Sequence, residues 1–130
     1  MTFKRILASV LGICFIAFAA MQYNDPDAAP WIATYLAAAI FSFLVVFNRI
    51  SRTLLLLAFV AFAVGAVVFW PEKWEGLAIG GGDIRNIEEA RESLGLAICS
   101  LAMLVFAFLS SSRTRLHPPH NAPHSKKWAN

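Results

Sequence analysis

Residues 28–71 read AAPWIATYLAAAIFSFLVVFN, then RISR, then TLLLLAFVAFAVGAVVFWP, so two long charge-free stretches flank a short basic turn. Two more charge-free stretches lie at residues 6–24 and 93–112. Each is about as long as a helix that crosses a hydrocarbon core of roughly 30 Å. The four stretches predict an all-α integral membrane protein, built as a four-helix bundle with short outer loops.

The composition agrees with a membrane protein. The chain is 58% hydrophobic, its mean hydropathy is +0.62, and only 15% of its residues are charged, whereas a soluble domain carries about a quarter charged residues. We therefore expect one transmembrane domain over residues 1–112 and a disordered cytoplasmic tail over residues 113–130, which are polar and rich in proline. Within the domain, helices are predicted at about residues 3–22, 28–47, 53–70 and 87–111.

Charge is segregated along the chain. Eight basic residues and no acids flank the spans on one side, namely Lys4, Arg5, Arg49, Arg52, Arg113, Arg115, Lys126 and Lys127. The other side carries all eight acids and three bases, Lys73, Arg85 and Arg91. Since basic residues are retained in the cytoplasm during insertion, we predict an N-in/C-in topology. The Asn24–Pro30 loop and the 70–92 loop then face outward.

This charge pattern also sets the expected surroundings. The basic side suits contact with anionic lipid head groups rather than nucleic acid. We expect an integral membrane location in the bacterial inner (plasma) membrane.

The first span has a second interpretation. Lys4-Arg5, an apolar run and Ala17-Phe18-Ala19 resemble a signal peptide with a small-residue cleavage site. The run is long enough to cross a membrane, however, and it leads directly into an acidic motif that cleavage would leave as a frayed terminus. We therefore expect it to be retained as the first helix.

The two acidic segments are the candidate site, because both are predicted on the outer side. The first contributes Asn24, Asp25 and Asp27, and the second Glu88, Glu89, Arg91 and Glu92. Glu88 and Glu92 share one helix face. Carboxylate and amide oxygens suit a hard cation such as Ca²⁺ or Mg²⁺, so the metal-ligand candidates are Asp25, Asp27, Glu89 and Glu92.

A structural interpretation of the same residues stays open, and their types favour it. Asn24 or Asp25 can cap the second helix, with Pro26 in its first turn, and Asn86 with Glu89 has the pattern of a cap on the last helix. Arg91 could join the segments as an ionic clasp to Asp25 or Asp27. Glu92 is explained least by capping, because it lies beyond the first turn.

The sequence gives little support for other kinds of functional site. No charged residue lies inside a predicted span, which argues against a proton relay or a substrate site at the midplane. His117, His120 and His124 have three- and four-residue spacings that suit a transition metal, but the neighbouring prolines prevent the helix that would align them, and no specific metal site is expected there. No nucleotide-binding or hydrolase motif is present.

Two sequence blocks resemble a known family. Asn24-Asp25-Pro26-Asp27, followed by Trp31 and Tyr35, resembles the signature of the transmembrane protein 220 family. Glu88-Glu89-x-Arg91-Glu92-x-x-Gly95-Leu96 resembles that family's second block, and the layout agrees over about residues 5–110. The resemblance implies a small multi-pass membrane protein and points to the same outer-face residues, but it implies no reaction.

The leading functional hypothesis is a non-enzymatic membrane protein that binds a partner or ligand through the acidic outer-face cluster. The candidate binding residues are Asn24, Asp25, Asp27, Trp31, Tyr35, Glu88, Glu89, Arg91 and Glu92. The alternative is a membrane-embedded enzyme with Asp25 and Glu92 as paired carboxylates around a metal, and a further one is a transporter or channel subunit. The expected partners are the lipid bilayer and a membrane protein or second copy of the chain. No cofactor other than a divalent cation is suggested, and no nucleic acid is expected.

Overall fold

The computed structural model of the protein describes residues 2–111, and within that range it is all-α, as predicted. It contains α1 (Phe3–Met21), α2 (Ala28–Val46), α3 (Arg52–Val68) and α4 (Ile84–Ser111). The predicted tail, with its three histidines, lies outside the described residues.

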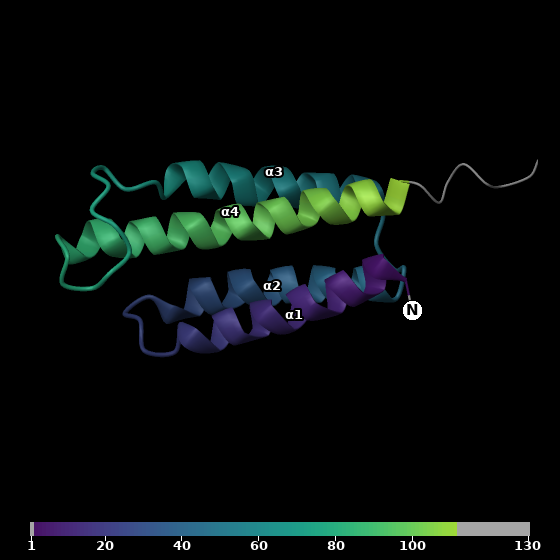
Figure 1. The fold of residues 1–130 in the computed structure, drawn as a ribbon, viewed down its shortest axis with the longest axis horizontal. Helices are drawn as coiled ribbons and strands as arrows, with labels where there is room; N and C mark the ends of the chain where they lie inside the picture. The colour runs from purple at the N-terminus through teal and green to yellow at the C-terminus, as the bar shows by residue number, and fades with distance from the viewer. Residues whose placement is uncertain (1, 112–130) are drawn as a thin grey trace, which may run out of the picture.

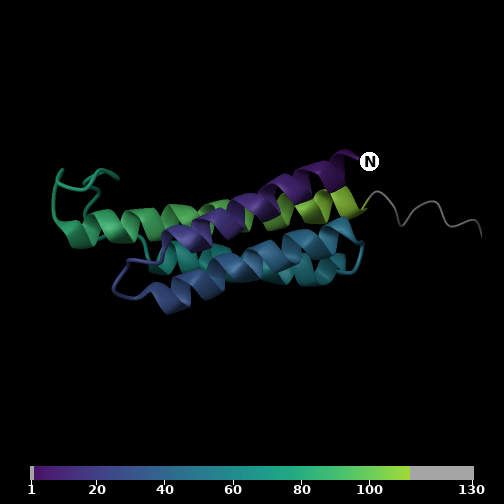
Figure 2. The same cartoon turned by 90° about the horizontal axis from the view of Figure 1, so that it is seen from below.

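The four helices run side by side along the long axis of the molecule (Figure 1). The start of α1, the α2–α3 turn and the end of α4 lie at one end, which we call the termini end (Figures 1 and 2). The α1–α2 loop and the α3–α4 loop lie at the opposite end. Because these two loops hold or adjoin both acidic segments, we call it the acidic end.

The lengths and surfaces of the helices suit a bilayer. Helices α1, α2 and α4 are long and apolar enough to cross a membrane, while α3 is an apolar helix of 17 residues, at the lower limit of a span. Large apolar side chains stand on the outside of the bundle, with Ile13 62%, Leu57 62% and Leu101 61% exposed. Side chains of this kind are stable in contact with lipid, so the fold is that of a helical membrane bundle.

The bundle consists of two tightly packed hairpins, α1 with α2 and α3 with α4. Small residues allow the close approach within each: Gly12 faces the ring of Phe43, and Gly65 faces Leu96. The second hairpin is also joined by hydrogen bonds, because the Ser93 hydroxyl donates to the Ala66 carbonyl and the Ser100 hydroxyl donates to the Phe59 carbonyl at 3.1 Å.

The hairpins share a core that begins at the termini end. Its fully buried large side chains come from all four helices and include Phe15, Val45, Leu55, Met103 and Phe106. Toward the acidic end the core cluster stops at Ala19, Tyr35 and Cys99. Between that level and the two loops the helices leave space, and this space contains the candidate site.

The start of α4 differs from the prediction. The helix begins at Ile84, and the Asp83 carboxylate accepts a hydrogen bond from the Arg85 backbone N–H at 3.1 Å. The expectation that Asn86 caps the helix is therefore wrong. Asn86 lies inside the first turn, where its amide donates to the Glu75 carboxylate at 3.4 Å. Asp83 takes the cap because its short side chain reaches the free N–H groups.

The start of α2 also differs. Its N-cap position is Asp27, not Asn24 or Asp25, and the Asp27 carboxylate makes no capping bond. Instead it accepts a hydrogen bond from the indole N–H of Trp31 at 3.0 Å, one turn along the helix. Pro26 precedes the helix, and Pro30 lies in its first turn, where a missing N–H costs nothing.

Candidate functional site

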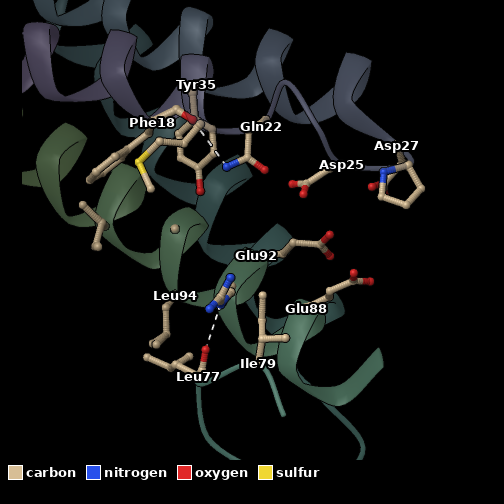
Figure 3. Close-up of a pocket in the computed structure, with 15 residues that line it drawn as sticks. Phe18, Gln22, Asp25, Asp27, Tyr35, Leu77, Ile79, Glu88, Glu92 and Leu94 are labelled. Carbon is tan, nitrogen blue, oxygen red and sulfur yellow. Dashed lines mark hydrogen bonds between the residues drawn. The ribbon is translucent and has the colours of Figure 1, made fainter. Parts of the chain in front are cut away.

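A pocket of about 480 Å³ opens at the acidic end between the two hairpins. Residues of both acidic segments line it, together with apolar residues of α1, α2, α4 and the α3–α4 loop (Figure 3). The lining comprises Phe18, Met21, Gln22, Asp25, Pro26, Asp27, Tyr35, Leu77, Ile79, Glu88, Arg91, Glu92, Leu94, Gly95 and Ile98. The two segments, about sixty residues apart in the chain, therefore face one another across one cavity.

Four carboxylates form the mouth of the pocket. Asp25 and Asp27 come from the α1–α2 loop, and Glu88 and Glu92 come from consecutive turns of α4 on the facing side (Figure 3). Among the described residues none of the four is in an ion pair, since the ion pairs found there are Lys73–Glu75 and Arg85–Glu89. Four acidic residues and one basic residue, Arg91, are among the described residues that line the pocket, so the mouth has an excess of negative charge.

The predicted ionic clasp through Arg91 is wrong. Arg91 lines the pocket, but its Nε donates to the carbonyl of Leu77 at 2.8 Å and so fastens the α3–α4 loop to α4. Within residues 2–111 it forms no ion pair with Asp25 or Asp27. Arg91 faces the α3–α4 loop, which supplies a carbonyl closer than the carboxylates of the other hairpin.

Glu92 is the most strongly perturbed carboxyl of the mouth. It lies in the last turn of α4 before the charge-free part that begins at Ser93. Burial raises its pKa from the usual 4.5 to about 7, and the charges of Asp27, Glu88, Asp25 and Glu89 contribute to the rise. Desolvation and like charges both disfavour the ionised form, whereas a cation bound beside Glu92 would favour it.

Tyr35 forms the inner surface of the pocket. Its side chain is 6% exposed, and its ring packs edge-on against Phe18 with centroids 5.7 Å apart. The hydroxyl lies against Gly95 of α4, where an added Cβ would overlap it. Glycine at position 95 therefore allows the tyrosine to reach from α2 to α4.

Three candidate residues do not line the pocket. Trp31 is buried and packs against Phe69, the residue after α3, with ring centroids 5.0 Å apart, so it links the hairpins outside the pocket. Glu89 pairs with Arg85 at 3.2 Å, and Asn24 is exposed in the α1–α2 loop. The remaining six candidates all line the pocket.

The metal candidates are not drawn together into a coordination shell. Among residues 2–111 no three His, Cys, Asp or Glu side chains are grouped so as to hold an ion. Glu89, one of the four, is turned toward Arg85. The carboxylates instead surround a cavity much wider than one cation.

Sequence reasoning missed the apolar walls, although a signal for them exists. Phe18, Met21, Gln22 and Asp25 follow the i, i+3, i+4, i+7 spacing of one helix face. Glu88, Arg91, Glu92, Gly95 and Ile98 follow the same spacing on α4. Extending each acidic motif along its own helix face would have identified these residues.

No curated protein and no solved structure matches the chain significantly. The family model described as "Transmembrane family 220, helix" matches residues 14–108, which include both acidic segments and every pocket residue. The chain therefore belongs to transmembrane family 220.

Proposed function

We propose that this multi-pass membrane protein is a binding protein whose pocket at the acidic end takes a positively charged ligand. The observation that carries the proposal is the mouth of four carboxylates around a cavity of about 480 Å³. Carboxylates that serve only as caps or clasps would be engaged with backbone or basic partners. Asp25, Glu88 and Glu92 have no such partner within residues 2–111.

The electrostatics support a cation over an anion or a neutral ligand. Burial raises the pKa of Glu92 to about 7, and the negative charges of the neighbouring carboxylates contribute to this rise. A bound cation would relieve this repulsion and would gain charge-assisted hydrogen bonds. The width of the pocket and the lack of a grouped ligand set among the described residues favour an organic cation over a bare metal ion.

The shape of the pocket favours binding over conduction. Ile98, the last residue of α4 to line it, lies about one helical turn short of the middle of the charge-free part of that helix. A transporter or channel subunit would need a path that continues past this level. With the predicted topology, the pocket would open on the outer side of a plasma membrane, such as the bacterial inner membrane.

The proposal is tested by stabilisation of the full-length chain in nanodiscs at pH 8, where Glu92 is ionised. Ethylammonium, Ca²⁺ and Mg²⁺ are compared with Na⁺ at equal ionic strength, and the melting temperature is measured. We expect ethylammonium to stabilise the wild type most, by about 2.7 kcal/mol at a hundred times its dissociation constant.

Two variants locate the effect. Glu92→Gln should abolish the stabilisation, whereas Glu72→Gln, which removes a charge from an exposed loop position outside the pocket, should retain it. Absence of any shift, or an equal shift in Glu92→Gln, would refute a cation site in this pocket. A shift produced only by Ca²⁺ or Mg²⁺ would support the metal alternative.

A further inference from the structure

The pocket is polar at its mouth and apolar below. The carboxylates of Asp25, Asp27 and Glu88 lie at the outer rim, and Glu92 lies one turn further in. Beneath them the walls are Phe18, Met21, Leu94 and Ile98. From Glu88 to Ile98 the α4 wall is about 15 Å long. A small hydrophilic cation would fill only the first part of this length.

The apolar part opens toward lipid. Met21 of α1 and Ile98 of α4 line the pocket, yet they are 74% and 46% exposed. Helices α1 and α4 belong to different hairpins and touch only weakly. An apolar chain can therefore leave the pocket between these two helices and continue among the acyl chains of the bilayer.

A second polar group lies inside the apolar part. The Tyr35 side chain is more than nine-tenths buried, and within residues 2–111 its hydroxyl makes no hydrogen bond. The hydroxyl points across the pocket toward α4 (Figure 3), where it meets Gly95. Among the described residues this hydroxyl is not one of the fully buried polar atoms that lack a partner, so it is open to the pocket, where a polar ligand atom at that depth can hydrogen-bond to it.

Resting on the proposed function, we propose that the ligand is an amphiphile with an ammonium head and a polar atom just below it. The ammonium lies among the mouth carboxylates, and the Tyr35 hydroxyl hydrogen-bonds to an oxygen such as an ester carbonyl. Gly95 is three residues below Glu92, so the two polar groups of the ligand are about 4.5 Å apart along the pocket. The apolar chain passes between α1 and α4.

Four probes separate these features, each titrated at pH 8 against the full-length chain in phosphatidylcholine nanodiscs with empty nanodiscs subtracted. β-Alanine decyl ester has all three features, namely an ammonium group, an ester carbonyl and an apolar chain. β-Alanine methyl ester lacks the chain, decyl propionate lacks the charge, and dodecylamine lacks the carbonyl. We expect the decyl ester to bind at least tenfold more tightly than the methyl ester, and decyl propionate not to bind.

Tyr35→Phe tests the hydroxyl directly. The variant should lower the affinity for the decyl ester about fivefold or more and leave the affinity for dodecylamine unchanged. A merely structural role of Tyr35 would weaken both probes equally and would overturn this part of the inference. Because the removed hydroxyl has no partner in residues 2–111, the ligand-free melting temperature should not fall, and it serves as the folding control.

The remaining outcomes separate the two proposals and the two sources of ligand. Equal affinities for the decyl and methyl esters would overturn the amphiphile and leave the cation pocket standing, whereas binding of neither ester would overturn both. With the decyl ester bound, replacing part of the phosphatidylcholine by phosphatidylethanolamine distinguishes the sources. If phosphatidylethanolamine competes with the decyl ester, the ligand is an amine-headed lipid of the leaflet. If binding of the decyl ester is unchanged, the ligand is a freely diffusing amphiphile.

Discussion

At the scale of single residues, Glu92 has a dual position. It belongs to the polar turns of α4, yet it is the mouth carboxylate nearest the apolar part of the pocket. Facing it are Asp25 and Asp27 from the α1–α2 loop, Glu88, Glu89 and Arg91 from α4 itself, and Tyr35 from α2. Burial and the four other carboxylates together hold its pKa near 7.

This pKa predicts how stability depends on pH. The folded protein holds the Glu92 proton up to about pH 7, whereas the unfolded chain releases it near 4.5. The native state therefore binds more protons between these values, and stability falls as pH rises through that window. Glu92→Gln should flatten the dependence and raise the melting temperature at pH 8, when no ligand is present.

Melting curves of the wild type and Glu92→Gln at several pH values between 4 and 9 measure this effect. Glu72→Gln is the control, because Glu72 is exposed and has no contact with the pocket. Parallel pH profiles for the wild type and Glu92→Gln would show that Glu92 ionises normally and that its surroundings are more hydrated than the packing indicates.

At the scale of elements, the loop before α4 positions one wall of the pocket. The Glu75 carboxylate accepts hydrogen bonds from the Asp83 backbone N–H and the Asn86 amide, and Asp83 caps the helix. Leu77 and Ile79 of the same loop line the pocket, where Arg91 is bonded to the Leu77 carbonyl. The loop and the first turns of α4 therefore form one hydrogen-bonded unit.

Variants of Asp83 and Asn86 test which side chain caps α4. Asp83→Ala should lower the free energy of unfolding by about 1 kcal/mol, because it leaves N–H groups of the first turn without a partner. Asn86→Ala should cost less, since it removes one long, part-buried hydrogen bond of 3.4 Å. Chemical denaturation measures both, and a larger cost for Asn86→Ala would restore that residue as the cap.

At the scale of the whole molecule, the two loops that form the pocket belong to one end of the bundle (Figure 1). The basic α2–α3 turn lies at the other end, where Lys4 Nζ also donates to the Asn48 side chain at 2.9 Å. The charge asymmetry predicts that the termini end is cytoplasmic. The pocket is then open to the outside, and this orientation decides which pool of ligand can reach it.

Single cysteines test the orientation. We expect an impermeant thiol reagent to label Ala78→Cys, in the α3–α4 loop, in intact cells, and to label Thr53→Cys, beside the α2–α3 turn, only after permeabilisation. Both positions are exposed in the structure. The parent chain gives the background from Cys14 and Cys99, which lie within helices. Labelling of position 53 but not 78 in intact cells would invert the topology.

The sequence by itself determined the four-helix membrane fold and identified the charged residues of the pocket. In lipid, the backbone N–H and C=O groups of an uninterrupted apolar stretch find hydrogen-bond partners when the stretch forms a helix. The two acidic segments are separated by two such spans, so the chain returns to the same end of the bundle. Asp25, Glu88 and Glu92 could be selected in this way because their charge stands out against an apolar chain.

Only the tertiary structure decided how these residues meet. Capping and ion pairing depend on which N–H or carbonyl group is nearest, so Asp83 rather than Asn86 caps α4, and Arg91 bonds to Leu77 rather than to the aspartates. The pocket exists because the shared core ends at Tyr35 and the hairpins then leave space between them. That separation arises from packing between helices distant in sequence, which the local pattern of residues does not specify.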